Sequence, residues 1–425
     1  MRKRMSILAG ALAVGLALTG CSSGSSNGSD PENPDQVEVF TWWASGSEKA
    51  GLDSLVKEFN SQYPDIEFIN AAVAGGAGSN AKAALASRLE SNNPPDTFQA
   101  HAGAELSDYI AAEQIQDLSG LYDDLGLNDV FPADLIERLT VDGKIYSVPS
   151  NIHRANVTWV NTQVLKDAGL DPTKAPESID AWISDLQKVK DSGVDTPLAL
   201  GTEFTQMQLL ENVLIADLGP DGYAGLWDGS TAWDSDGVKK AVDQYDQLMD
   251  FVNQDYAGLD WDAATQIVID GNAAYNVMGD WAEAAFTQAG QTWGTEYTTW
   301  PTPGTDGVFD FLADSFTLPV GAPHETAAKD WLTTISSAEG QKAFNTVKGS
   351  IPARTDADPA DYGEYQQSAM KSFAEDAIVS SLAHGAAAPI AWSSDISSAV
   401  GKFGSDRDQD ALIQALVAAA ESALS

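Results

Sequence analysis

The sequence predicts an α/β fold built on a doubly wound parallel sheet. From Val37 onward, short apolar runs typical of strands alternate with segments whose apolar residues recur at helical spacing. The first part of this body follows the order β-α-β-α-β, in which helices connect neighbouring parallel strands. Such sheets bind ligands beyond the carboxyl ends of their strands, so the residues that follow each strand are candidates for a binding site.

Five elements are predicted between residues 37 and 102. The strands are "VEVFTWW" (37–43), "DIEFINAAV" (65–73) and "DTFQAHA" (96–102), the last preceded by Pro94-Pro95. The first helix places four apolar residues on one face at i, i+3, i+4 and i+7: Leu52, Leu55, Val56 and Phe59. The second helix follows "GGAGSN" and contains Ala83, Leu85 and Leu89.

The character of the chain changes beyond about residue 155. Residues 155–300 are rich in predicted helix, in "SIDAWISDLQKVKDSG", "VKKAVDQYDQLMDFVNQ" and "AATQIVIDGNAAYNVMGDWAEAAF". A second α/β set follows in "GVFDFLADSFTLPV" and the helix "ETAAKDWLTTISSAEGQKAF", and the tail 360–425 is again helical. At 425 residues the chain is long enough for two medium-sized domains.

The N-terminus has the features of a secretory signal. Three basic residues precede the apolar run Ile7–Leu18, which is too short to span a bilayer as a helix. The run leads into "LTGC", which resembles the bacterial lipobox and implies cleavage before Cys21 and lipidation of its thiol. The alternative is an ordinary signal peptide beside a chance cysteine. Cys21 is the only cysteine of the chain, so no intramolecular disulfide can form.

Residues 22–36, "SSGSSNGSDPENPDQ", are predicted to be a flexible tether. We therefore expect a mature protein that starts at Cys21 and is anchored by lipid to the outer face of the cell membrane. The net charge of −39 becomes −39 − 3 = −42 once the three basic residues of the signal are removed. A surface this acidic repels nucleic acid and anionic lipid headgroups, so the sequence predicts no nucleic-acid partner and no membrane contact except through the lipid.

Linear signatures of catalysis are scarce. Residues 24–28 fit the G-x-S-x-G pattern of a nucleophile elbow, yet they lie in the tether with neither a strand before nor a helix after them. The sequence has no H-E-x-x-H, no C-x-x-C and no P-loop, and "DSDG" at 234–237 lacks the other ligands of a calcium loop. With 62 acidic residues, no pair can be singled out as a glycosidase dyad. The sequence therefore predicts no catalytic residue, no metal site and no cofactor.

Polar and aromatic residues gather where the predicted strands end. In "DTFQAHA" the two-residue period puts Gln99 and His101 on one face. Trp42 and Trp43 end the first strand, and adjacent side chains of a regular strand point to opposite faces. The remaining members are the loop Gly75, Gly76 and Gly78, then Asp314 and Ser315 after "VFDFLA", and Trp281, Lys348 and His384 in loops or helix starts.

Each of these residues also has a structural alternative. A tryptophan can be core, a glycine cluster can be only a turn, and Asp314 or His384 can lie at a helix end. Together, however, they supply aromatic planes, amide donors, an acid, an amine, imidazoles and a carboxamide. Aromatic planes cover the C–H face of a pyranose, and charged groups bind its hydroxyls strongly. The set therefore favours an uncharged, polyhydroxylated ligand.

Longer motifs place the chain beside a known family. They include "WWA", "NAAVAGGAGSNAKA", "PPDTFQAHAG", "NIHRANV", "MGDWA", "DSFTLP", "KGSI" and "AHGAAAP". With these motifs the chain resembles the extracellular solute-binding proteins of family 1, which deliver sugars to ABC importers, and more narrowly their glucose/galactose-binding lipoprotein branch. The resemblance runs from Val37 nearly to the C-terminus.

The resemblance implies a two-lobed, periplasmic-binding-protein-like (type II) α/β fold. The ligand cleft would lie between the lobes, which three hinge crossings near residues 152, 303 and 352 would join. The N-terminal lobe would comprise residues 37–152 and 306–352, and the C-terminal lobe residues 153–305 and 353–425.

The resemblance also implies the residues of the site. The sugar-binding groups would be Trp42, Trp43, Gln99, His101, Asp314, Lys348 and His384, with Glu48, Gly75, Gly76 and Trp281 as further contributors. The segment "ASGSE" between Trp43 and Glu48 is one residue longer than the family pattern, which puts the role of Glu48 in doubt. Of the two tryptophans, Trp43 lies further from the strand and is expected to form the wall for the sugar ring, while Trp42 is partly core.

The implied function is capture of a monosaccharide by lobe closure, with D-glucose first and galactose or mannose next. ABC permease subunits would recognise the closed monomer, and no bond of the sugar would be broken. Asp314 would accept hydrogen bonds from hydroxyls, and Lys348 and the histidines would donate them. The alternatives are another sugar or small oligosaccharide, a secreted glycoside hydrolase with the same aromatic and acidic groups, and a purely structural cell-surface protein.

Overall fold

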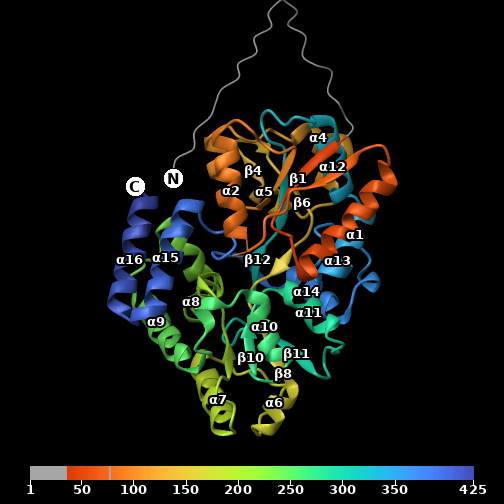
Figure 1. Cartoon of the computed structure of the whole chain (residues 1–425). Helices are drawn as coiled ribbons and strands as arrows, with labels where there is room; N and C mark the ends of the chain where they lie inside the picture. The colour runs from red at the N-terminus through yellow and green to blue at the C-terminus, as the bar shows by residue number, and fades with distance from the viewer. Residues whose placement is uncertain (1–35, 76–77) are drawn as a thin grey trace, which may run out of the picture. The chain divides into compact units, whose positions relative to one another are not determined.

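The computed structural model describes residues 36–75 and 78–425. The predicted signal peptide, Cys21 and the tether up to residue 35 lie outside these residues, as does Gly76. The described part is an α/β body in which α1 (Gly46–Gln62) and α2 (Ser79–Glu90) lie beside β1 (Gln36–Phe40), while α6 (Thr162–Asp167) and α7 (Ile179–Asp191) lie at its other end (Figure 1).

The largest sheet in the described residues has the strand order β2-β1-β3-β13-β6. Its other strands are β2 (Glu67–Asn70), β3 (Thr97–His101), β13 (Asp314–Thr317) and β6 (Val148–Pro149). β1 pairs in parallel with β2 and β3, as the β-α-β-α-β pattern predicts. β13 and β6 join in antiparallel orientation, so the sheet is mixed rather than fully parallel.

Two further sheets and a hairpin complete the strand framework of the described residues. One sheet has the order β11-β8-β10-β9, formed by β11 (Tyr297–Pro301), β8 (Val157–Asn161), β10 (Tyr275–Val277) and β9 (Leu198–Ala199). The other has the order β14-β12-β7, formed by β14 (Ala377–Ser380), β12 (Val308–Leu312) and β7 (His153–Arg154). The hairpin pairs β4 (Thr140–Val141) with β5 (Lys144–Ile145).

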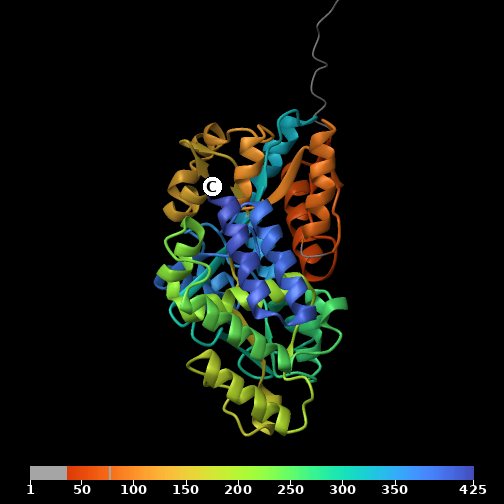
Figure 2. The same cartoon turned by 90° about the vertical axis from the view of Figure 1, so that its left-hand side faces the viewer.

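The remaining helices cover these sheets. They are α3 (Glu105–Ala111), α4 (Ser119–Leu125), α5 (Ala133–Arg138), α8 (Glu203–Asp228), α9 (Asp236–Leu248), α10 (Trp261–Ile269), α11 (Glu283–Gln288), α12 (Glu325–Ser336), α13 (Ala338–Lys348), α14 (Glu364–Glu375), α15 (Ile390–Asp406) and α16 (Gln409–Ala423). Short 3₁₀ turns lie at η2 (Leu127–Asp129), η3 (Met249–Phe251), η4 (Tyr256–Gly258), η5 (Asp280–Ala282) and η6 (Pro359–Asp361). The C-terminal helices α15 and α16 pack against each other (Figure 2).

Three predicted elements differ from the observed ones. β1 ends at Phe40, so both Trp42 and Trp43 lie beyond the strand. The predicted helix from Glu325 to Phe344 is two helices, because Ser337 is extended and its side chain caps α13 by accepting from the Gly340 amide. The segment 263–286 is not all helix: it holds α10, the buried strand β10, η5 and α11, with Gly271-Asn272 at the turn between α10 and β10.

Two apolar clusters form the core of the described residues. One surrounds the first sheet and includes Val39, Phe98 and Phe316, and the other lies around α8 and includes Leu210 and Tyr275. Helices in residues 36–75 and 78–425 are all too short or too polar to cross a bilayer. β14, from the predicted C-terminal lobe, pairs with β12, from the predicted N-terminal lobe. The lobe boundaries given by residue number remain a prediction.

Candidate functional site

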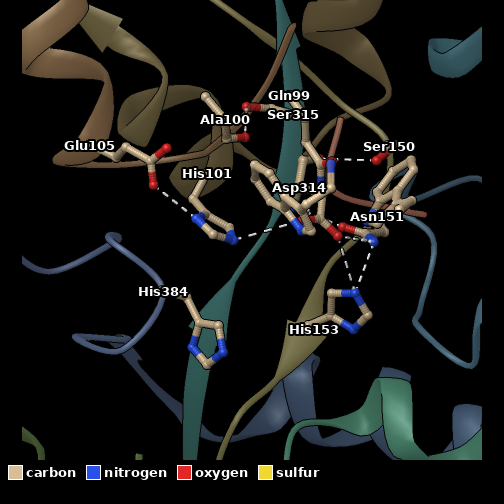
Figure 3. Close-up of polar contacts among 12 residues, drawn as sticks. Gln99, Ala100, His101, Glu105, Ser150, Asn151, His153, Asp314, Ser315 and His384 are labelled. Carbon is tan, nitrogen blue, oxygen red and sulfur yellow. Dashed lines mark hydrogen bonds and ion pairs between the residues drawn. The ribbon is translucent and has the colours of Figure 1, made fainter. Parts of the chain in front are cut away.

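Asp314 is the first residue of β13 and the most heavily bonded carboxylate of the cleft (Figure 3). Gln99 donates to Oδ1 over 2.9 Å, Asn151 donates to Oδ2 over 2.8 Å, and Nε2 of His153 lies 3.2 Å from Oδ2. The backbone amide of Asp314 in turn donates to the Asn151 side chain over 2.8 Å. These contacts fix the position of a carboxylate that is almost fully buried.

The charge of Asp314 is stabilised from several sides. Burial alone would raise the pKa of Asp314, but His153, His101 and Lys348 together outweigh it and leave the pKa lowered. At neutral pH Asp314 is therefore ionised, and its oxygens can only accept hydrogen bonds.

His153 bridges two carboxylates. Its Nδ1 contacts Asp280 of η5 and its Nε2 faces Asp314. Burial disfavours the imidazolium, yet Asp280 and Asp314 together raise the pKa of His153. Both ring nitrogens are occupied by carboxylates, so His153 holds Asp314 in place instead of presenting a free donor to the cleft.

His101 belongs to a second group of polar contacts, which includes Glu105 and Lys82. Its Nδ1 lies 2.8 Å from Glu105, which also accepts from Lys82 over 2.7 Å, and its Nε2 lies 3.8 Å from Asp314 (Figure 3). Burial alone would raise the pKa of Glu105, but Lys82 and His101 lower it to about 2. The Glu105 carboxylate is thus ionised and orients the His101 ring.

Two tryptophan rings line the inner pocket, and each packs against a histidine. Trp42 packs on His101 with ring centroids 4.9 Å apart. Trp281 contacts His384 at 5.0 Å and His153 at 5.2 Å. Gly78 supports Trp42 from behind: its φ is +98°, and a Cβ there would come within 3.1 Å of the Trp42 ring.

Lys348 ends α13 and points its ammonium group into the same space. Its Nζ donates to Glu48 over 3.1 Å and lies 5.9 Å from the centroid of the Trp281 ring. Burial raises the pKa of Glu48, and Lys348 acts in the opposite direction. The pair joins the start of α1 to the end of α13.

These side chains surround an inner pocket that continues into a larger outer cavity. The inner pocket has a volume of about 30 Å³, enough for about two or three water molecules. The outer cavity has a volume of about 610 Å³ and lies between the first turns of α1 and α10, with α11 beside them. Trp42, Glu48 and Trp261 line both spaces, so the two form one cleft.

The structure brings seven of the predicted site residues to the inner pocket. They are Trp42, Glu48, His101, Trp281, Asp314, Lys348 and His384. Gly75 lines only the outer cavity, and Gly76 lies outside the described residues. Gln99 lies behind Asp314: its carbonyl oxygen accepts from Thr41 and from the Trp42 amide, and its amide group donates to Asp314.

The expectation that Trp43 forms the wall for the sugar ring, with Trp42 partly in the core, is wrong. Trp43 is fully buried and packs on Phe344 at 4.5 Å and Phe316 at 5.5 Å, outside the lining of the cleft. Trp42 faces the cleft instead. The physical reason is that the strand ends at Phe40, so the face alternation no longer applies, and the space under α13 takes the second ring.

Sequence reasoning missed four residues that line the inner pocket: His153, Phe204, Trp261 and Leu312. His153 lies in "NIHRANV" next to a predicted chain crossing, which was an available signal. Trp261 starts α10 and follows no strand, so the strand-end argument could not find it. Within residues 36–75 and 78–425, no group of histidine, cysteine and acidic side chains has the arrangement of a metal site.

The fold and this cleft define a two-lobed solute-binding protein. A solved structure of a chitin oligosaccharide binding protein superposes with a TM-score of 0.79, covering 92% of this chain and 98% of that one, and at 20% identity this likeness concerns the fold. The chain belongs to the bacterial extracellular solute-binding protein family, whose sequence pattern matches residues 43–342.

Two relatives match over almost the whole chain. An uncharacterized ABC transporter extracellular-binding protein of Pyrococcus horikoshii is 36% identical, covering 95% of this chain and 92% of its own. A probable sugar-binding periplasmic protein of Rhizobium meliloti is 32% identical, with coverage of 92% and 94%. Two less similar relatives are the xylose/arabinose-binding protein XacG of Haloferax volcanii (29% identical, coverage 86% and 79%) and the glucose-binding protein GlcS of Saccharolobus solfataricus (24% identical, coverage 78% and 64%).

Proposed function

We propose that this chain is the substrate-binding component of an ABC sugar importer and that it captures a monosaccharide, D-glucose first and galactose or mannose next. The relatives are ABC transporter binding proteins and sugar-binding proteins by name, which supports the transporter class and a sugar as ligand. They differ in the sugar, since one names xylose and arabinose and another glucose. The choice of a hexose therefore depends on the motifs of the glucose/galactose-binding branch and on the cleft.

The observation that carries the proposal is the ionised, buried Asp314 beside Trp42 and Trp281. The carboxylate accepts hydrogen bonds, Lys348 donates them, and the rings offer flat apolar surfaces for C–H groups. The charged groups of the cleft already have partners within the protein: Lys348 contacts Glu48, and His153 lies between Asp314 and Asp280. A neutral polyol adds no further charge to this buried site, whereas a charged ligand would.

Capture requires movement of the lobes. A hexose fits the outer cavity of about 610 Å³ but is larger than the inner pocket of about 30 Å³, so it reaches Asp314 and His384 only in a more open form. The lining comes from both predicted lobes, with Trp42 and Asp314 on one side and Trp281 and His384 on the other. A ligand that contacts both sides binds the closed form better and shifts the equilibrium towards it, which is the state that a permease would recognise.

Calorimetric titration with a panel of monosaccharides and oligosaccharides tests the proposal. We expect glucose to bind more tightly than galactose or mannose, and each deoxy analogue that loses a bonded hydroxyl to bind far more weakly. Tight binding of an oligosaccharide without binding of glucose would contradict the proposal of a monosaccharide ligand. The proposal of a sugar importer would still stand.

A glycoside hydrolase is the second candidate, because two carboxylates with opposite pKa shifts line the inner pocket. Burial raises the pKa of Glu48 while that of Asp314 is lowered, as in an acid and nucleophile pair. Glu48 is engaged by Lys348, however, and the family to which the chain belongs is one of binding proteins. Sustained release of the aryl group from aryl-glycosides would favour the enzyme.

We further propose that the protein is a monomer anchored through lipid on Cys21 to the outer face of the cell membrane. The lipobox and the tether that follows it support the anchor, and the family description supports an extracellular location. The partners would then be the sugar and the permease subunits of the importer.

A further inference from the structure

The loop that carries His384 is held by a buried glutamate from α8. Glu211 accepts hydrogen bonds from the Tyr223 hydroxyl over 2.7 Å, from the Ala383 amide over 3.1 Å and from the Leu382 amide. The Ser381 hydroxyl lies 3.2 Å from its second oxygen. This carboxylate therefore holds residues 381–383 by three hydrogen bonds.

The same loop also contacts Glu105 of α3. The Glu105 amide donates to the Gly385 carbonyl over 2.8 Å, and Gly385 has a φ of +68°, where a Cβ would come within 2.6 Å of the Glu105 carboxylate. His384, between these two attachments, cannot move far. Figure 3 shows its ring beside that of His101, and their centroids are 5.9 Å apart.

Two hydrogen bonds link Glu211 to Ser381 and Ser381 to His384. The charge of Glu211 decides which group donates in each. Above a pH of about 7, the pKa to which burial raises Glu211, the carboxylate is ionised and can only accept, so the Ser381 hydroxyl then donates its one hydrogen to Glu211. Nδ1 of His384 lies 2.7 Å from the same Ser381 oxygen. Since the serine hydrogen is already used, this second bond forms only if His384 donates from Nδ1.

We infer that Glu211 and Ser381 hold His384 as the neutral tautomer with its proton on Nδ1, which makes Nε2 a hydrogen-bond acceptor inside the cleft. Nε2 is buried and has no hydrogen-bond partner among the described residues. Burial, together with His101 and His153, lowers the pKa of His384 well below its ordinary value, which agrees with a neutral ring. Glu211 and Ser381 are positioning residues, since neither lines the inner pocket.

This inference specifies what the ligand must present. The sequence led us to expect that the histidines donate to the sugar, whereas an acceptor at Nε2 requires a hydroxyl that donates. That part rests on the proposed sugar-binding function. The tautomer itself does not, so the two can fail separately.

Nitrogen-15 NMR of histidine-labelled protein measures the tautomer directly. Protonated and unprotonated ring nitrogens have well separated frequencies, and the His384→Gln variant identifies the resonances by their loss. Burial raises the pKa of Glu211 to about 7, so the spectrum is recorded at about pH 8, where the carboxylate is ionised. We expect a proton on Nδ1 and none on Nε2. A proton on Nε2, or on both nitrogens, overturns the inference.

Two variants test whether Glu211 and Ser381 set the tautomer. In Glu211→Gln the new amide group can donate to Ser381, whose hydrogen is then free for Nδ1, so we expect His384 to shift towards the Nε2-protonated form. Ser381→Ala should give a mixture of tautomers, and Ser381→Thr, which keeps the hydroxyl, should restore the wild-type signal. The control is Glu325→Gln, a matched change in an exposed ion pair. An unchanged His384 signal in both Glu211→Gln and Ser381→Ala contradicts the assigned role.

Fluorinated sugars test the ligand side. Fluorine can accept a weak hydrogen bond but cannot donate, so an acceptor at Nε2 rejects one fluoro-deoxy sugar as strongly as the matching deoxy sugar, by on the order of tenfold or more. In Glu211→Gln that fluoro-deoxy sugar should regain affinity relative to the deoxy sugar. If NMR shows the Nδ1 tautomer but the protein binds no sugar, the proposed function is wrong and the inference about the tautomer still holds. If the wild-type protein binds glucose and also binds every fluoro-deoxy glucose equally well, Nε2 of His384 is not a hydrogen-bond acceptor for the sugar.

Discussion

Asp314 and His101 are direct register partners in the antiparallel pair of β13 and β3. The pairing places an ionised carboxylate from late in the chain beside the imidazole at the end of the third strand. Ser315 extends the same register, and its hydroxyl donates to the Ala100 carbonyl over 2.9 Å (Figure 3). The position of the carboxylate is therefore set by strand pairing and not by a flexible loop.

Removal of the Asp314 carboxylate should strongly weaken sugar binding. We expect Asp314→Ala to reduce the affinity for glucose by about tenfold to a hundredfold, because a ligand hydroxyl loses a charged acceptor worth roughly 1.5–3 kcal/mol. Calorimetry measures the change. Asp234→Ala, which removes an exposed carboxylate ahead of α9, is the matched control, and equal effects of the two changes would show that the site lies elsewhere.

The two neighbouring tryptophans should respond in different assays. Trp42→Phe should reduce the sugar-induced change in tryptophan fluorescence, since Trp42 lines the cleft together with Trp261 and Trp281, whereas Trp43→Phe should leave it unchanged. Trp43→Ala should lower the free energy of unfolding by about 3–5 kcal/mol, because it leaves a cavity against Phe316 and Phe344. Chemical denaturation measures the second effect. A fluorescence change that disappears only in Trp43→Phe would restore the order first expected.

His153 should make the stability depend on pH. Folding raises the pKa of His153 above its ordinary value of about 6.5. The protonated ring therefore stabilises the protein fully below about pH 6.5, and this contribution is lost as the pH rises through the pKa that His153 has in the folded protein. His153→Gln leaves Asp280 and Asp314 without their shared cation, so we expect a loss of about 3–5 kcal/mol at low pH. Denaturation of both proteins between about pH 6 and about pH 9 should show this difference shrinking as the pH rises. A difference that stays constant would mean that folding does not raise the pKa of His153.

Trp261, which the sequence did not indicate, should contribute to binding. It is partly buried and lines both the inner pocket and the outer cavity. We expect Trp261→Ala to weaken glucose binding by about fivefold to a hundredfold, equivalent to roughly 1–3 kcal/mol of apolar burial. The control is Trp293→Ala, which changes a partly buried tryptophan outside the cleft. Unchanged affinity in Trp261→Ala would mean that the ligand does not contact Trp261.

The lipid anchor is testable in cells. Cys21→Ser removes the thiol that would be acylated, so we expect the protein to move from the membrane fraction to the medium or the periplasm. Mass spectrometry of the mature N-terminus should find acyl groups only in the wild type. Membrane association that persists in Cys21→Ser would refute the anchor.

Local pattern was sufficient for much of this protein. The alternation of strands and helices in residues 37–102 predicted the parallel core β2-β1-β3, because strand and helix periodicities are properties of short segments. The motifs predicted the family. They also indicated seven residues that the fold brings to one pocket. Two of them, Trp42 and His101, lie at the ends of parallel strands, which meet at one edge of the sheet. The other five lie on helices, in turns or on the antiparallel strand β13, and were indicated by the motifs.

Only the tertiary structure decided which of these residues face the cleft. Trp42 and Trp43 are neighbours with the same chemistry, and the space beneath α13 decides that Trp43 is core. Gln99 and His153 are polar in sequence, but their partners, Asp314 and Asp280, lie far along the chain and turn both residues into supports. The direction of the hydrogen bond at His384 depends on Glu211 of α8. Periodicity is local, whereas burial, partner and protonation are set by contacts between distant segments.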